Sequence, residues 1–383
     1  MEEKEYGLVL AGGGTKGAYE VGIWKALCEM EINVTAIVGA SIGALNGALF
    51  LQNNFEETVK MYENIKIDNI MNVNGIDANK NIFDLSNIFN LAADYTKQKG
   101  IDNTPLREMI RKYVDMDKIY NSPIDFGLVT YSVKNKTPLQ VFKNEIPKEQ
   151  MEDYLLASSC FPIFKPQIIN GEEYYDGGLY DNIPSNMLIE KGYKNIIIAD
   201  IAGVGFSKKT VNKDIYVKVI SSSEDLGGTF EFNHERILNN IKLGYLDTMK
   251  SFNRLQGHIY YFKPEEFAKM LEAFNLQTIY GLEYAAQMYN IDRCREYTFE
   301  EFIQELRNRH LEAEKTYVKM KETNIIQIGK KLNKLFDKGL GICIAKDLYL
   351  DRPASKLSNY LFNFVKDYIV AAKALIELGN YMD

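Results

Sequence analysis

The densest run of apolar residues in the chain is AIVGASIGALNGALFL, at residues 36–51. Its pattern predicts a short buried strand, a sharp turn and a buried helix. The run is too short to span a bilayer, and glycines, Ser41 and Asn46 interrupt it. We therefore expect it to lie in the core of a globular domain.

Two earlier segments extend this pattern. Residues 6–11 are mostly apolar, which is typical of a strand buried on both faces. A glycine-rich segment, 12–17, follows, and residues 18–30 then carry apolar side chains at helical spacing. Strand, loop, helix, strand, turn and helix in this order predict parallel strands joined by right-handed crossovers.

The middle of the chain is patterned less evenly. Residues 53–100 are weakly patterned, and only a short helix around 55–65 is indicated. Thr104–Tyr113 is predicted to be a helix capped by Thr104, with Pro105 in its first turn. Further predictions are a helix at 148–159, paired strands at 126–133 and 139–142, a hairpin of 167–170 and 173–175 turning at Gly171, and strands at 195–200 and 216–220.

The end of the chain changes character. From about residue 259 onward, long stretches such as 299–320 and 358–378 have helical periodicity. The predicted fold class is therefore α/β, a mainly parallel sheet sandwiched by helices, with a helical C-terminal region.

Composition narrows the function. The 383 residues are 46% hydrophobic and 25% charged, as in an ordinary globular protein, and the net charge of −7 makes nucleic acid an unexpected partner. Four scattered cysteines (28, 160, 294 and 343) fit a reducing compartment, and three histidines are too few for a multi-histidine metal site. The acidic N-terminus has no signal-peptide pattern, so we expect a cytoplasmic protein.

The turn inside the apolar run reads Gly39-Ala40-Ser41-Ile42-Gly43, a G-x-S-x-G motif. A serine at such a strand-to-helix turn projects its hydroxyl, and the helix N-terminus behind it stabilises a developing oxyanion. This geometry suits a nucleophile. The motif is short enough to occur by chance, so a structural turn with a small helix-capping residue stays open on this motif alone.

The first glycine segment, Gly12-Gly13-Gly14-Thr15-Lys16-Gly17, also matches the dinucleotide fingerprint G-x-G-x-x-G. That fingerprint needs an acidic residue at the end of the second strand, where this chain has Gly39-Ala40-Ser41. A Walker A loop is excluded because Ala18 and Tyr19 follow Gly17. Successive glycine N–H groups bind an alkoxide for the reason they bind phosphate, so an oxyanion cradle is the better interpretation.

A third motif, Asp176-Gly177-Gly178, follows the predicted hairpin. It places a carboxylate on an open turn, although Asp-Gly turns are common in all proteins.

Together, in this order, GGGTKG, GASIG and DGG resemble the motifs of the patatin-like phospholipases. The segments CFPIFKP (160–166), DNIP (181–184) and residues 223–244 also look like that family, and the resemblance covers about residues 6–258. One departure is Lys16, where arginine is commoner; lysine cannot make the planar two-pronged contact with a phosphate.

The resemblance implies a carboxylic ester hydrolase that cleaves lipid acyl esters with a Ser-Asp dyad. Ser41 would be the nucleophile and Asp176 the proton acceptor, while N–H groups of Gly12, Gly13, Gly14 and Ile42 would hold the oxyanion. Neither a metal nor a cofactor is implied. The expected domains are a catalytic domain at 6–258, with a motif-bearing core at 6–205, and a helical region at 259–383.

Several alternatives stay open. A nucleotide-binding protein and a catalytically silent binding module are the competing functions. Histidines 234, 258 and 310 all follow Asp176, the order of a Ser-Asp-His triad, although His234 looks like a helix-surface residue. Lysines and apolar residues interleave at 319–346, as in a solvated helix or a peripheral membrane contact. The natural lipid and the oligomeric state are not indicated.

Overall fold

The computed structural model describes residues 4–72, 100–203, 205, 214–322, 338–351 and 359–382. The chain divides into two compact units, Met1–Thr248 and Met249–Asp383. Each unit is considered by itself.

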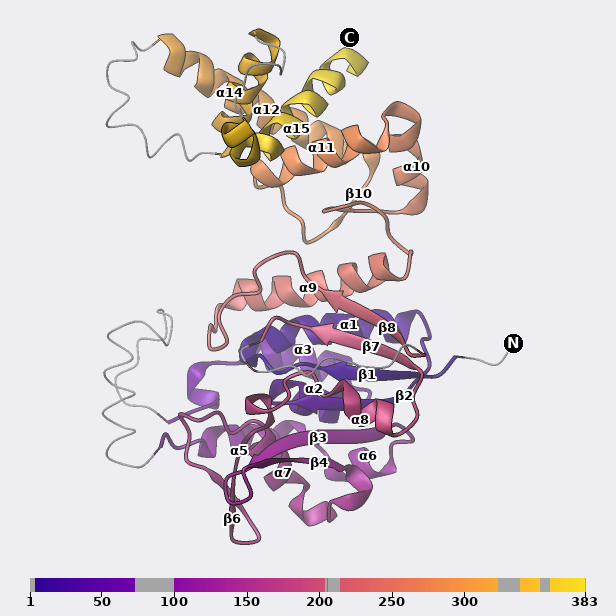
Figure 1. The fold of residues 1–383 in the computed structure, drawn as a ribbon, viewed down its shortest axis with the longest axis vertical. Helices are drawn as coiled ribbons and strands as arrows, with labels where there is room; N and C mark the ends of the chain where they lie inside the picture. Colours follow the sequence, from indigo (N-terminus) through magenta and orange to yellow (C-terminus); the bar gives the residue numbers. More distant parts are fainter. Residues whose placement is uncertain are drawn as a thin grey trace. The chain divides into compact units, whose positions relative to one another are not determined.

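The first unit is built on one mainly parallel sheet (Figure 1). Its strand order is β5-β6-β3-β2-β1-β7-β8, with β4 paired to β3. The pairs β3–β2–β1–β7–β8 are parallel, whereas β4, β5 and β6 add antiparallel pairs at one side. The strands are β1 Tyr6–Leu10, β2 Val34–Ala40, β3 Asp125–Ser132, β4 Thr137–Phe142, β5 Gln167–Ile169, β6 Glu172–Asp176, β7 Asn195–Asp200 and β8 Tyr216–Ser221.

Helices cover both faces of this sheet, and the predicted α/β sandwich is confirmed. On one face, Val9 and Val38 pack with Leu188 of α8. On the other, Ile37 and Phe126 contact α2 at Gly47. The helices of the unit are α1 Ala18–Glu29, α2 Ile42–Phe50, α3 Phe55–Asn64, α5 Thr104–Tyr113, α6 Met116–Asn121, α7 Met151–Ser158, α8 Ser185–Glu190 and α9 His234–Ser251, which runs three residues past the boundary of the unit.

Two local predictions differ from the structure. Helix α5 begins at Thr104 but is not capped by it; the Asp102 carboxylate accepts hydrogen bonds from the Thr104 N–H (3.1 Å) and hydroxyl (2.7 Å). The helix predicted at 148–159 is a 3-10 turn, Lys148–Gln150, followed by α7. Within the weakly patterned stretch 53–100, residues 73–99 lie outside the described residues.

The second unit is helical, as predicted. Its helices are α10 Pro264–Ala273, α11 Leu276–Met288, α12 Phe299–Glu322, α14 Lys338–Asp351 and α15 Asn359–Met382, with short parallel strands β9 Tyr261–Phe262 and β10 Glu296–Tyr297. Phe262, Phe302 and Leu282 are fully buried in its core. Of the lysine-bearing segment 319–346, residues 323–337 lie outside the described residues.

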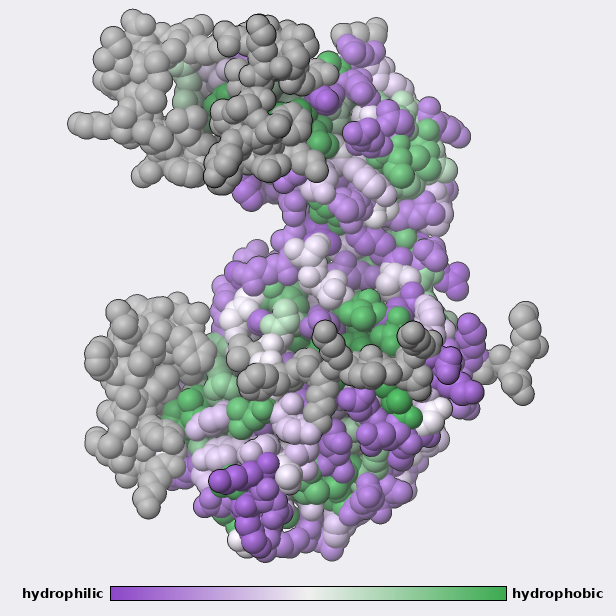
Figure 2. Space-filling view, in the orientation of Figure 1, coloured by the Kyte–Doolittle hydropathy of each residue, from purple (hydrophilic) through white to green (hydrophobic). Residues whose placement is uncertain are grey.

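Polar and apolar side chains are mixed over the visible face of the sheet unit (Figure 2). Among the helices that the structure describes, none combines the length and the apolar character needed to cross a membrane.

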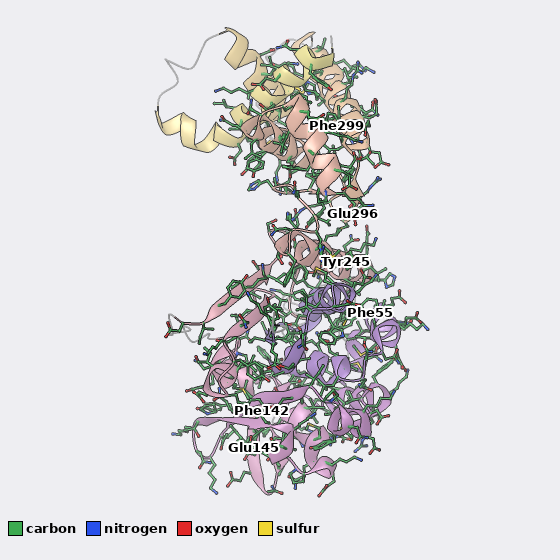
Figure 3. All side chains as sticks on the ribbon, turned by 90° about the vertical axis from the view of Figure 1, so that its right-hand side faces the viewer. Phe55, Phe142, Glu145, Tyr245, Glu296 and Phe299 are labelled. Carbon is green, nitrogen blue, oxygen red and sulfur yellow. The ribbon has the colours of Figure 1, made fainter. Side chains whose placement is uncertain are left out.

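Helices α1 and α9 touch at a pair of glycines. A Cβ atom at Gly22 would lie 1.9 Å from the Ile241 carbonyl oxygen, and one at Gly244 would lie 1.9 Å from that of Tyr19. The Lys25 ammonium of α1 lies over the ring of Tyr245, a residue labelled in Figure 3, at 5.0 Å from the ring centre. At these two glycines the helices therefore pack backbone against backbone, with no room for a side chain.

Gly244→Ala is expected to lower the free energy of unfolding of the first unit by about 1–3 kcal/mol, because the added methyl group forces the helices apart. Lys242→Ala, on the exposed side of the same helix, is the matched control and should change stability little. Urea unfolding followed by circular dichroism measures both. An unchanged midpoint for Gly244→Ala would show that the helices do not meet at this point.

Candidate active site

The structure brings the three sequence motifs together around one pocket. The pocket has a volume of about 370 Å³ and lies beyond the carboxyl ends of β1 and β2. Of the predicted site residues, those that line it are Gly12, Gly13, Gly14, Thr15, Ser41, Ile42, Asp176 and Gly178. The other predicted site residues do not line the pocket: Lys16, Gly17, Gly39, Ala40, Gly43 and Gly177.

Ser41 lies at a backbone turn that few residues other than glycine adopt. Its φ is 54° and its ψ is −125°, directly before the first residue of α2. The turn is tight: a Cβ atom at Gly39 would lie 2.4 Å from the Gly43 carbonyl group, and one at Gly43 would lie 2.3 Å from the Leu10 oxygen. Both flanking glycines are therefore required by close backbone packing, as in a nucleophile elbow.

Two serines at the end of α7 hold the Ser41 backbone. The Ser158 hydroxyl accepts a hydrogen bond from the Ser41 N–H (3.1 Å) and donates one to the Val129 carbonyl oxygen (2.8 Å). The Ser159 hydroxyl donates to the Ser41 carbonyl oxygen (3.3 Å). Neither serine was predicted from the sequence to act at the site; their only signal was a position just before CFPIFKP.

The Asp176 carboxylate lies beside Ser41 and is only 4% exposed. Burial raises its pKa from 3.8 to about 6, although hydrogen bonds from the Ser41 hydroxyl and the Gly178 N–H lower it. The Gly178 N–H is 2.7 Å from Oδ1. A carboxylate that little water reaches thus lines the same pocket as Ser41.

The glycine loop is tied to the segment that follows the aspartate turn. The Gly12 N–H donates to the Asn182 carbonyl oxygen (3.2 Å), so it is already engaged. The N–H groups of Gly13, Gly14 and Ile42, by contrast, donate to no acceptor among the residues that the structure describes. Gly14 has a φ of 61°, a backbone conformation that favours glycine.

The other residues of the loop are anchored to neighbouring segments. The Thr15 hydroxyl donates to the Gly228 carbonyl oxygen (3.0 Å), and the Lys16 ammonium donates to that of Ala202 (2.9 Å). The Gly17 carbonyl oxygen accepts a hydrogen bond from Asn46 of α2 (2.9 Å). Thr15, Lys16 and Gly17 therefore fix the loop to its surroundings.

Most of the remaining pocket wall is apolar. Phe161 and Phe230 meet edge to face, with ring centres 5.8 Å apart. The other apolar or aromatic lining residues are Leu45, Tyr62, Ile65, Ile70, Leu106, Met109, Phe164, Leu179 and Phe232. Such a wall suits a hydrocarbon chain, with few polar groups to orient the rest of a ligand.

The structure describes all three histidines of the chain, and none of them lines this pocket. His234 is the first residue of α9, exposed, with Nδ1 3.0 Å from the Glu63 carbonyl oxygen, which agrees with its interpretation as a helix-surface residue. His258 and His310 belong to the second unit. Across the described part of the chain, no group of three or more His, Cys, Asp or Glu side chains is placed to hold a metal ion.

The sequence of the chain is similar to those of known proteins. The chain is 25% identical over 299 residues to lysophospholipase NTE1 of Kluyveromyces lactis, a match that covers 73% of this chain and 18% of that protein. For lysophospholipase NTE1 of Scheffersomyces stipitis the identity is 25% over 308 residues, with coverage of 76% and 18%. The matched region is thus less than a fifth of either relative.

Among solved structures, VipD from Legionella pneumophila matches with a TM-score of 0.42 and 14% identity, over 99% of this chain and 90% of that one. The family model "Patatin-like phospholipase" matches residues 8–189. This range contains the glycine loop, the Ser41 turn and the aspartate turn, in the order and on the strands just described. Residues 8–189 of the chain therefore form a patatin-like phospholipase domain.

Proposed function

We propose that this protein is a serine lipid acyl hydrolase, similar to phospholipase A, that cleaves fatty-acyl esters through an acyl-enzyme. The observation that carries the proposal is that Ser41, at its tight turn, and the buried Asp176 carboxylate line the same mostly apolar pocket. The patatin-like phospholipase domain and relatives named as lysophospholipases support a lipid hydrolase.

In the first step, the Ser41 oxygen attacks the ester carbonyl carbon and Asp176 accepts the serine proton. A pKa of about 6 keeps the Asp176 carboxylate ionised at neutral pH while making it a stronger base than an exposed aspartate. The negative charge that develops on the carbonyl oxygen is held by the N–H groups of Gly13, Gly14 and Ile42, since that of Gly12 is engaged with Asn182.

Collapse of the tetrahedral intermediate breaks the ester C–O bond, and the leaving alcohol takes the proton from Asp176. The acyl group stays on Ser41. Water then attacks the acyl-enzyme with Asp176 as the general base, and the second collapse returns the proton to the Ser41 oxygen and releases the fatty acid. Each turnover consumes one ester and one water, and the dyad and the loop supply all the groups that the steps require.

The apolar wall favours an acyl chain as the part of the substrate that enters the pocket. A lipid ester is accordingly the proposed substrate class, and a peripheral contact of the 319–346 segment with a membrane stays a prediction.

A nucleotide-binding role is disfavoured, because one of the loop N–H groups is already engaged and most of the pocket wall is apolar. A silent binding module is disfavoured by the intact Ser41–Asp176 pair.

Ser41→Ala and Asp176→Asn are each expected to lower the hydrolysis of a lysophospholipid and of a p-nitrophenyl ester by several orders of magnitude, while the double variant loses little more. Ser221→Ala, at an exposed serine outside the pocket, is the matched control and should keep wild-type activity. A fluorophosphonate probe, followed by peptide mass spectrometry, should label Ser41. Hydrolysis by Ser41→Ala at the wild-type rate would rule out this mechanism.

The acid limb of kcat/KM is expected near pH 6, because Asp176 must be ionised to accept the proton and burial raises its pKa to about 6. A histidine would give a similar limb, so the three histidines are the necessary control. His234→Ala, His258→Ala and His310→Ala should each keep both the limb and most of the activity. Loss of activity to the Ser41→Ala level in any of them would indicate a triad instead of a dyad.

Asp176→Asn is also expected to stabilise the protein at neutral pH. The folded-state pKa of about 6 lies above the ordinary 3.8, so the wild type loses stability relative to this variant as the pH rises from about 4 through 6. At pH 8 the variant should be more stable by about 2–3 kcal/mol, and below pH 4 the difference should vanish. Thermal unfolding against pH measures this, with Asp68→Asn at an exposed site as the control. A difference that does not change with pH would contradict it.

A further inference from the structure

The segment DNIP, after the aspartate turn, carries an asparagine that lines the pocket and is only 3% exposed. We propose that Asn182 is a positioning residue that sets the direction of the N–H groups of Gly13 and Gly14 by holding the Gly12 peptide groups on both sides. The inference rests on the proposed function and adds a residue that the chemistry itself does not use.

Both backbone polar groups of Gly12 are bonded to this one residue. The Asn182 side-chain Nδ2 donates to the Gly12 carbonyl oxygen (2.9 Å), and the Asn182 carbonyl oxygen accepts from the Gly12 N–H (3.2 Å). Asn182 and Gly12 are 170 positions apart in the chain. A hydrogen bond on each side fixes the two peptide planes that flank Gly12, which a single bond would leave free to tilt.

The surroundings of the Asn182 side chain are mostly glycine. A Cβ atom would lie 2.3 Å from its Oδ1 if placed on Gly12, 2.7 Å from Oδ1 if on Gly178, 2.9 Å from Nδ2 if on Gly203, and 3.0 Å from its Cβ if on Gly205. These four glycines come from the glycine loop, the aspartate turn and the loop after β7. The absence of side chains on three segments therefore leaves room for one amide.

This placement has a consequence for catalysis. Asn182 lies six positions after Asp176 and contacts the glycine loop, so the proposed base and the proposed oxyanion donors are held by one short segment. If the Gly12 peptide groups tilt, the next two N–H groups move away from the developing charge. That charge is full only in the transition state, so the loss is expected in kcat and not in KM.

Asn182→Ala should lower kcat for a p-nitrophenyl ester by about 10- to 100-fold, less than the loss of a direct oxyanion donor, and leave KM within about twofold. Fluorophosphonate labelling of Ser41 should slow in parallel. The matched control is Asn240→Ala: Asn240 is also 3% exposed, and its Nδ2 donates to the Leu226 carbonyl oxygen at 2.9 Å, but it does not line the pocket. It should keep wild-type kcat at a similar loss of melting temperature.

Gly203→Ala tests the same bond from the opposite side. Its Cβ would lie 1.6 Å from the Gly12 carbonyl oxygen and 2.9 Å from Asn182 Nδ2, and Gly203 does not line the pocket. We expect a similar fall in kcat, and a double variant with Asn182→Ala that loses little more than either alone. If Asn182→Ala fails to fold, Asn182→Asp, which keeps the size of the side chain but replaces the Nδ2 donor, decides the matter.

A kcat for Asn182→Ala within about twofold of that for Asn240→Ala, or a change confined to KM, would overturn the positioning role. Fully additive losses in the double variant would overturn it as well. The proposed function fails separately, through Ser41→Ala retaining activity. If Ser41 is essential and Asn182→Ala is as active as its control, only the inference about Asn182 is lost.

Discussion

The left-handed backbone at Ser41 is the constraint on which the rest of the site depends. A non-glycine residue at a φ of 54° and a ψ of −125° costs on the order of 1–3 kcal/mol, and it persists only where the surrounding structure holds it. Close backbone packing at Gly39 and Gly43 supplies one restraint, and the hydroxyls of Ser158 and Ser159 supply the other. The strained residue is the serine that lines the pocket together with Asp176.

The buried carboxylate of Asp176 is a second energetic cost in the same site. Asp176 is a carboxylate at 4% exposure, and its pKa rises because burial disfavours the charge. A site selected only for stability would not keep a strained serine and a buried carboxylate in contact. Their combination suits proton transfer, because the base is ionised at neutral pH and yet poorly solvated.

Much of the fold could be predicted from the sequence, because its signals are local. Burial is indicated by the apolar runs at β1, β2 and β7, and turn geometry by the glycine motifs that follow β1 and β2. Each of these signals is contained within a few residues. The predicted cap of α5 was wrong because Asp102 and Thr104 both have side chains that bind nearby backbone groups. The helix begins at Thr104 after the N-cap residue Asn103, and it is the Asp102 carboxylate that accepts the Thr104 N–H.

The contacts that complete the candidate site could not be predicted in this way. Ser158 reaches Ser41 across 117 positions, and Asn182 reaches Gly12 across 170. Neither pairing leaves a period or a motif in the chain, because a hydroxyl or an amide near a helix end or after a turn has many local uses. Only the folded sheet, which brings the ends of β1, β2 and β6 together, decides which partner each one has.

The glycines of the three motifs divide by what they make room for. Gly39, Gly43 and Gly177 lie against neighbouring backbone. A Cβ atom added at these positions would lie 2.4, 2.3 and 2.1 Å from the nearest backbone atom, so no larger residue fits there. Gly12 and Gly178 instead make room for the Asn182 amide. A glycine-rich loop is therefore not by itself a binding cradle: which of its N–H groups stay available depends on the side chain that occupies the space its glycines leave.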